Sequence, residues 1–139
     1  MIPAAVSVPG NSALHGTVQR TLQTWRLMKT QLKKGTLEMC VLAVLARGDS
    51  YAYQLVSTLA ETMEISEGTI YPLMRRLQAE AWVSTYLVES NSGPSRKYYS
   101  LTSAGRRSLL EMEEEWRSFV SEVNCVLGQQ GKQNTGENP

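Results

Sequence analysis

Apolar positions in the middle of the chain predict two consecutive helices. Nearly every position of Leu37–Ala46 is apolar, which is typical of a helix that is buried on most sides. Gly48 ends this helix, and Asp49-Ser50 offers side-chain oxygens that can cap the next one. The second helix has an apolar residue at every fourth position: Tyr51, Leu55, Leu59 and Met63.

A third helix is predicted over the stretch GTIYPLMRRLQAEAW, residues 68–82, with Ser66 as its N-cap. Pro72 lacks an N–H, so we expect a tight or irregular first turn. One narrow stripe of this helix is apolar: Ile70, Leu73, Met74, Leu77 and Ala81. The opposite side carries Gly68, Tyr71, Pro72, Arg75 and Gln78, with Thr69 and Arg76 on its flank.

After Trp82 the period changes from helical to alternating. Residues 83–89 alternate as a strand does, residues 91–95 (NSGPS) supply turn chemistry, and residues 96–101 (RKYYSL) indicate a returning strand. A mainly α fold with a small β-hairpin in this order is the winged helix-turn-helix arrangement. In it the third helix enters the DNA major groove, and the hairpin reaches the backbone or the minor groove. We assign residues 31–101 to this DNA-binding domain.

The last predicted helix begins at Thr102, a candidate N-cap, and ends near Leu127. Its apolar residues follow one another in steps of three and four, as in a coiled-coil seam: Leu109, Met112, Trp116, Phe119, Val123 and Val126. Packing against the first helix can cover part of this stripe, and the same helix of a second chain can cover the rest. We favour a homodimer and assign residues 102–128 to a dimerisation helix.

The two ends of the chain carry no visible chemistry. Residues 1–30 have few charges and several Pro and Gly residues, so we expect a flexible N-terminal extension or a short helix. Residues 129–139 are polar and are expected to form a disordered tail.

The overall composition does not distinguish between classes of globular protein, but the distribution of charged residues along the chain is informative. The 139 residues are 42% apolar and 19% charged, as in ordinary globular proteins, and the formal net charge is +1. Basic residues nevertheless come in pairs at 33–34, 75–76, 96–97 and 106–107, while four glutamates cluster within residues 111–115. This pattern predicts separate basic and acidic faces.

The candidate contacts with double-stranded DNA come from the third helix and the hairpin: Thr69, Tyr71, Pro72, Arg75, Arg76, Arg96 and Lys97. Small residues at a helix start let DNA approach, a tyrosine hydroxyl can donate to phosphate, and arginines can neutralise phosphate or bind guanine. Taken alone, the arginines of the third helix are more typical of a solvated helix face than of a binding site. Together with the hairpin and its own basic pair, they favour DNA binding. A winged helix that binds a protein instead stays an alternative, because the net charge is close to zero.

Other classes of protein find little support. Cys40 and Cys125 lie in apolar helical patterns, as buried reduced thiols of a cytoplasmic protein do. No CxxC pair exists and the only histidine is His15, so we expect no metal and no cofactor. We expect no membrane span and no secretory signal, because no apolar run is long enough and no basic segment precedes the first one. Without a phosphate loop, a triad or an apolar carboxylate pair, we expect no enzyme.

Three blocks resemble the signature of PadR-like transcriptional regulators: LKKGTLEMCVLAVLARGDSYAYQL, GTIYPLMRRLQAEAWV and GPSRKYYSLTSAG. The similarity spans residues 32–127, and the chain length resembles the short-tailed subfamily with one dimerisation helix. The resemblance implies a bacterial, cytoplasmic, dimeric repressor whose DNA affinity responds to a small molecule. Ala52 and Ala81 stand where the family commonly has glycine. If Ala81 must be left-handed, it costs on the order of 1 kcal/mol; otherwise the third helix continues through it.

Trp116 has two open interpretations. Multidrug-sensing members of the family use a tryptophan in the last helix to line a flat cavity between subunits, and Trp116 follows Thr102 at a similar distance. With its symmetry mate it can sandwich a small planar aromatic effector. It can equally be an interface side chain without a ligand, which the seam pattern also predicts.

Overall fold

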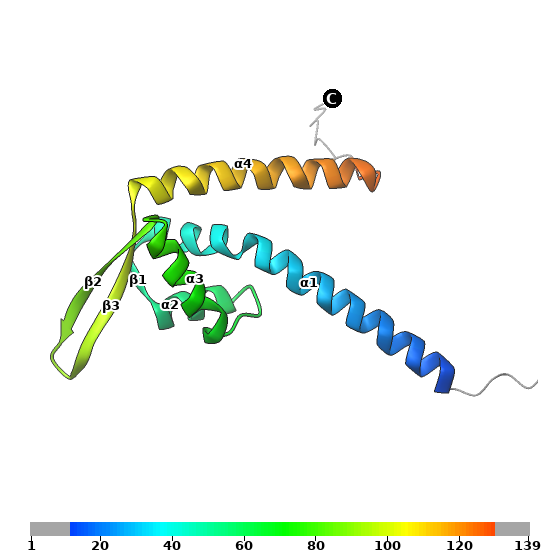
Figure 1. Cartoon of the computed structure of the whole chain (residues 1–139), viewed down its shortest axis with the longest axis horizontal. Coiled ribbons are helices and arrows are strands. Elements are labelled where there is room, and N and C mark those ends of the chain that lie inside the picture. The colour runs from blue at the N-terminus through cyan, green and yellow to red at the C-terminus, as the bar shows by residue number, and fades with distance from the viewer. Residues whose placement is uncertain (1–11, 130–139) are drawn as a thin grey trace, which may run out of the picture. The chain divides into compact units, whose positions relative to one another are not determined.

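The computed structural model describes the backbone of residues 12–129 and their side chains, except those of residues 12–17, 25 and 34. The elements follow the order α1, β1, α2, α3, β2, β3, α4 (Figure 1). The chain divides into two compact units, residues 1–37 and 38–139, and α1 (Ser12–Arg47) belongs to both. Residues 1–11, part of the predicted flexible start, and residues 130–139, most of the predicted disordered tail, lie outside the described residues. The side chain of His15 also lies outside them.

Helix α1 is longer than the apolar pattern predicted. It runs without a break from Ser12 to Arg47, so the helix expected over Leu37–Ala46 begins much earlier. The boundary that we placed between residues 30 and 31 falls inside this helix, and residues 12–30 are helical, which agrees with the second of our two alternatives, although the helix is longer than a short one. Within α1, the Thr30 hydroxyl donates to the Arg26 carbonyl (2.9 Å) and the Thr36 hydroxyl donates to the Leu32 carbonyl (3.1 Å), each one turn back.

The core of the second unit collects apolar side chains from α1, α2 (Ala52–Ala60), α3 (Glu67–Ala79), β2 (Val83–Ser90), β3 (Gly93–Leu101) and α4 (Ser103–Val126). The buried residues include Val41, Leu42, Leu45, Leu55, Leu59, Ile70, Leu73, Met74, Leu77, Val83, Tyr99 and Leu109. Four of the five residues in the predicted α3 stripe are among them. Ala81 is not, because it lies beyond the end of the helix and is exposed.

The sheet contains a short strand, β1 (Ser50–Tyr51), that the pattern did not predict. It pairs with β3, which also pairs with β2, so the antiparallel order is β1-β3-β2. The cap predicted at Asp49-Ser50 is wrong, because Ser50 is a buried residue of β1 and Tyr51 is the N-cap of α2. Helix α2 also ends at Ala60, short of Met63.

The end of α3, the sheet and the start of α4 meet in one hydrogen-bonded junction. Ala81 is left-handed (φ 58°), the Trp82 N–H donates to the Leu77 carbonyl (3.0 Å), and the Ala81 N–H donates to the Gln78 carbonyl (3.0 Å). This is a Schellman motif with alanine in the glycine position. The Thr102 hydroxyl donates to the Ala81 carbonyl (2.7 Å) and accepts from the N–H of Gly105 (3.0 Å), so the predicted N-cap of α4 is confirmed.

Candidate nucleic-acid interface

Helix α3 buries one side and exposes the other. Ile70, Leu73, Met74 and Leu77 face the core, whereas all the candidate DNA contacts of this helix are exposed: Thr69, Tyr71, Pro72, Arg75 and Arg76. The predicted division of the helix into a core side and a solvent side is therefore confirmed.

The first turn of α3 is open toward solvent. Ser66 is the N-cap as predicted, but its side chain makes no capping bond and its Oγ instead lies 3.2 Å from Oγ1 of Thr69. Pro72 lies inside the helix and supplies no N–H, so the carbonyl four residues earlier loses its usual donor. N–H groups without a side-chain cap favour an anion, whereas Glu67 in the same turn opposes one. The sequence interpretation overlooked Glu67.

The two arginines of α3 differ. The guanidinium of Arg76 forms an ion pair with the carboxylate of Glu38 on α1, and the two side chains are 60% and 25% exposed. Arg75 is exposed and has no ion-pair partner among the residues that the structure describes. Arg75 can therefore meet phosphate directly, while Arg76 must first leave Glu38.

The basic pair of the hairpin is divided between the two faces of the sheet. Successive residues of a strand point to opposite faces, and Lys97 pairs across from Leu87 while Arg96 pairs across from Val88. The sequence interpretation treated Arg96 and Lys97 as one cluster. The alternation of the strand could have separated them.

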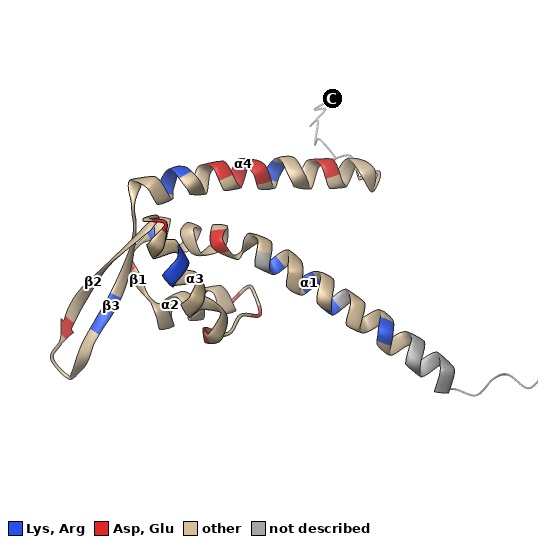
Figure 2. Cartoon of the chain, in the orientation of Figure 1, with Lys and Arg blue, Asp and Glu red and all other residues tan. Residues whose placement is uncertain are grey.

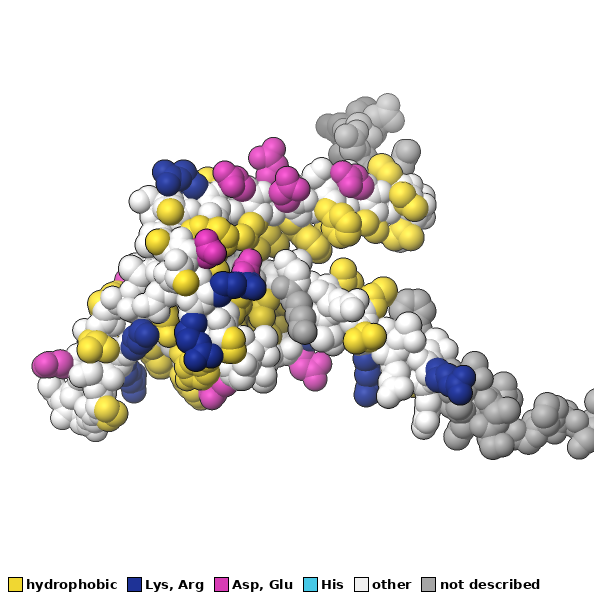
Figure 3. All heavy atoms as spheres, in the orientation of Figure 1, with side chains coloured by type: hydrophobic (Ala, Val, Ile, Leu, Met, Phe, Trp, Pro, Cys, Tyr) yellow, Lys and Arg dark blue, Asp and Glu magenta, His cyan; other side chains and the backbone are white. Residues whose placement is uncertain are grey.

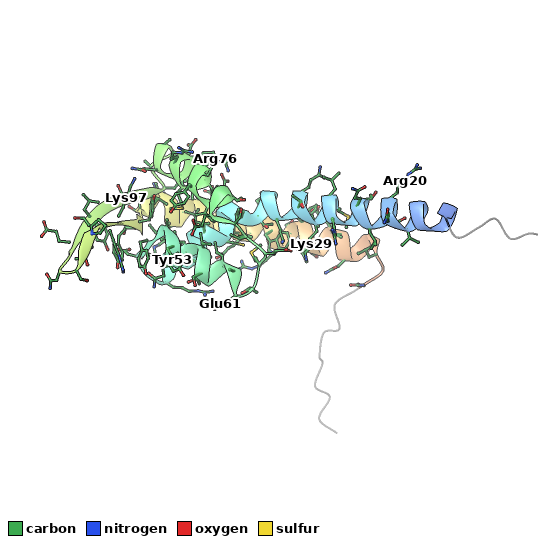
Figure 4. All side chains as sticks on the ribbon, turned by 90° about the horizontal axis from the view of Figure 1, so that it is seen from below. Arg20, Lys29, Tyr53, Glu61, Arg76 and Lys97 are labelled. Carbon is green, nitrogen blue, oxygen red and sulfur yellow. The ribbon has the colours of Figure 1, made fainter. Side chains whose placement is uncertain are left out.

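Lys97 lies on the sheet face that meets α3. Its Nζ is 5.5 Å from the ring centroid of the buried Tyr99. Burial raises the pKa of Tyr99, and the electrostatic effect of Tyr71 raises it further. Gln78 of α3 also donates to Thr85 of β2 (3.4 Å). Basic side chains gather over α3 and β3 (Figure 3), and Lys97 and Arg76 lie on the same side in the view of Figure 4.

Arg96 lies on the other sheet face, over a cluster of tyrosines. Its guanidinium is 4.9 Å from the ring centroid of Tyr51, a cation–π distance. Tyr51 meets Tyr98 edge-on (5.5 Å), and Tyr98 stacks on Tyr86 (5.6 Å). The Tyr86 hydroxyl donates to the carboxylate of Asp49 (2.8 Å), and this hydrogen bond raises the pKa of Tyr86. The cluster fixes Arg96 and ties the hairpin to β1, and the sequence interpretation missed it.

Helix α4 presents apolar side chains that nothing in the described chain covers. Trp116 (41% exposed), Phe119, Val123 and Val126 are all exposed, and Met112 is half-buried. With Met112, these residues form the surface that we call the α4 stripe. Leu109 is buried within the chain and is unavailable to a partner, so its assignment to the interface is wrong. Acidic side chains of α4 line the edge opposite its apolar side chains (Figure 3), and the acidic positions follow one another along the ribbon of this helix (Figure 2).

Other chemistry is sparse in the described part of the chain. Residues 12–129 contain no group of three or more His, Cys, Asp or Glu that could hold a metal ion, and none of their helices is long and apolar enough to cross a membrane. Cys40 is half-buried, which raises the pKa of its thiol. Cys125 is exposed, so its predicted burial is wrong.

A helical core, an α3 with a basic outer side and a hairpin beside it define a winged helix-turn-helix protein. The model of the transcriptional regulator PadR-like family matches residues 41–111. A PadR family transcriptional regulator from Eggerthella lenta DSM 2243 is 34% identical, with 81% of this chain and 99% of that chain covered and a TM-score of 0.74. A PadR-like transcriptional regulator from Bacillus cereus strain ATCC 14579 is 38% identical, with 73% and 99% covered and a TM-score of 0.64. The chain belongs to the PadR-like family of transcriptional regulators.

Proposed function

We propose that the chain is a homodimeric DNA-binding repressor, bacterial and cytoplasmic, that binds a near-palindromic operator. The observation that supports the proposal is that Tyr71 and Arg75 lie exposed, one turn apart, on α3, while Lys97 lies beside the ring of Tyr99 on the sheet that Gln78 of α3 contacts through Thr85. A helix and a strand that carry hydrogen-bond donors and positive charge can bind the major groove of DNA and the phosphates along it.

In this mechanism α3 enters the major groove, and its surface from Thr69 to Arg76 reads base edges. Tyr71 and Lys97 bind phosphates on the α3 side of the hairpin. Arg96 approaches from the opposite sheet face and is the more distant phosphate contact. The α4 stripe pairs two chains and holds the two α3 helices about one DNA turn, roughly 34 Å, apart.

Replacing Arg75 by Ala tests this assignment. We expect about a tenfold or larger loss of affinity for the DNA upstream of the chain's own gene, because each dimer loses two charge contacts. Arg76→Ala should weaken binding less, since that guanidinium already has a carboxylate partner. Arg117→Ala is the matched control, because Arg117 lies on α4 and pairs with Glu113 (3.2 Å). Equal losses in Arg75→Ala and Arg117→Ala, measured by fluorescence anisotropy, would refute the assignment of α3.

We further propose that a small planar aromatic effector binds between the α4 helices and releases the repressor. The ring of Trp116 lies 6.4 Å from that of Phe119, centroid to centroid, and both side chains are exposed, which supports an aromatic surface there. An effector can change DNA affinity only by as much as its own affinity differs between two spacings of the DNA-binding domains.

Tryptophan fluorescence tests the effector. Planar aromatic dyes should quench the wild type, and Trp116→Phe should lose this part of the quenching although Trp25 and Trp82 remain. Quenching that is unchanged in Trp116→Phe would leave Trp116 as an interface side chain without a ligand.

A further inference from the structure

We propose that Thr102 and Gly105 are positioning residues for DNA binding. They fix the start of α4 to the end of α3, and in this way they set the distance between half-sites that the dimer accepts. The proposal rests on the dimeric DNA-binding function proposed above. It assigns a role to two residues that belong neither to the candidate DNA contacts nor to the α4 stripe.

Two short connections meet where α3 ends and α4 begins. Residues 80–82 join α3 to β2, and a single residue, Thr102, joins β3 to α4. The Thr102 N–H donates to the Trp82 carbonyl (3.0 Å), and the Thr102 hydroxyl donates to the Ala81 carbonyl (2.7 Å). The N-cap of α4 is therefore bonded twice to the chain that leaves α3. We call Ala81, Trp82, Thr102 and Gly105 the α3–α4 junction.

Gly105 allows the first turn of α4 to lie directly on the backbone of Trp82. Gly105 is buried, and a Cβ there would lie 2.9 Å from the carbonyl carbon of Trp82, closer still to its oxygen, and 2.7 Å from Cδ1 of Leu101. Any side chain at this position therefore requires the helix to shift. One turn later Leu109 is buried in the core. The first two turns of α4 are thus packed on the DNA-binding domain in one orientation.

Beyond Leu109 the same helix carries the proposed dimer contact. The α4 stripe begins at Met112, and the helix continues to Val126 without a proline, the residue that most often kinks a helix. In a dimer held by the α4 stripe, the direction of α4 at the α3–α4 junction therefore determines where each α3 lies relative to the other.

An alanine at Gly105 would change that direction by a useful amount. Its Cβ requires a shift of about 1 Å, and Gly105 and Leu109 are about 6 Å apart along the helix, so α4 tilts by roughly 10°. Helix α3 is about 20 Å long, so the same rotation moves its first turn by about 3 Å. That displacement is close to the roughly 3.4 Å between successive base pairs.

The test measures affinity as a function of half-site spacing. The probes are the operator that footprinting finds in the DNA upstream of the chain's own gene, versions with one base pair added or removed between the half-sites, and a single half-site. By fluorescence anisotropy, Gly105→Ala should bind the native spacing about tenfold more weakly, because the DNA must deform to meet both α3 helices. One altered spacing should recover part of the loss. The affinity for the single half-site and the dimer dissociation constant, from sedimentation equilibrium, should stay unchanged.

Gly48→Ala is the matched control for a glycine-to-alanine change, because a Cβ at Gly48 would meet no atom within 4 Å. It should keep the spacing preference of the wild type.

A second pair of variants decides the question if Gly105→Ala does not fold. Thr102→Val removes the hydroxyl that donates to the Ala81 carbonyl and accepts from the Gly105 N–H (3.0 Å), at nearly constant volume. It should reduce the difference in affinity between the native and the altered spacings. Thr102→Ser keeps the hydroxyl and should behave as the wild type does.

The outcomes separate this proposal from the proposed function. A wild type that binds none of the probes would refute the DNA-binding function itself. A wild type that binds all spacings equally would overturn only the positioning role. Variants that lose affinity by the same factor for every spacing and for the single half-site, or a Thr102→Val that behaves like Thr102→Ser, would also overturn it, because the junction would then serve stability alone.

Discussion

Ala81 occupies the only left-handed position of a non-glycine residue in the described part of the chain. An L-residue with a Cβ pays a steric cost there, and the Schellman bonds to Leu77 and Gln78 hold the conformation in place. Both possibilities for this residue followed from the sequence. The structure decides between them, and it adds a long-range bond from the Thr102 hydroxyl to the Ala81 carbonyl.

Ala81→Gly should raise the free energy of unfolding by about 1 kcal/mol, because glycine adopts this conformation without a Cβ clash. The measurement is urea unfolding at a fixed protein concentration, since dimerisation couples to stability. Ala79→Gly is the matched control: it is the last residue of α3, and glycine there should lower the free energy, by less than the roughly 0.5–1 kcal/mol of a helix interior. A loss of stability in Ala81→Gly would contradict the strain that we assign to Ala81.

At the scale of elements, the hairpin divides its charges between two faces. Lys97 shares a face with Tyr99 and α3, whereas Arg96 lies over Tyr51 on the other face. The two substitutions should therefore have unequal effects on DNA binding.

Lys97→Ala should weaken binding to the operator more than Arg96→Ala. It should also make the slope of log affinity against log salt concentration shallower by about 2 per dimer, for one phosphate contact in each subunit. Anisotropy titrations of the two variants at several salt concentrations measure this directly. Equal losses, or a larger loss in Arg96→Ala, would mean that the tyrosine cluster faces the DNA.

The sequence predicted the elements that have strong local patterns. The α3 stripe, the hairpin and the cap at Thr102 each depend on residues close together in the chain. Strand β1 does not, because Ser50 and Tyr51 become a strand only by pairing with Tyr99 and Tyr98 of β3. The partner of Arg76 was hidden for the same reason, since Glu38 is thirty-eight residues away. Residues 12–30 were underestimated because their described side chains, those of residues 18–24 and 26–30, are all exposed, and such a helix gives a weak local signal.

At the scale of the whole molecule, the formal net charge of +1 makes overall attraction to DNA weak. In the proposed dimer, affinity comes from the local basic surface of α3 and the hairpin, which the two chains present twice. A protein-binding winged helix would use an apolar patch instead, and its affinity would depend little on salt.

The most direct test is the salt dependence of binding to the DNA upstream of the chain's own gene, for the wild type and for Arg75→Ala/Arg76→Ala. With about six to eight phosphate contacts, the logarithm of affinity should fall against the logarithm of salt concentration with a slope of roughly −5 to −7. The double variant should bind more weakly and with a shallower slope. Weak binding that neither salt nor the substitutions change would contradict the account and would indicate a protein partner for this winged helix.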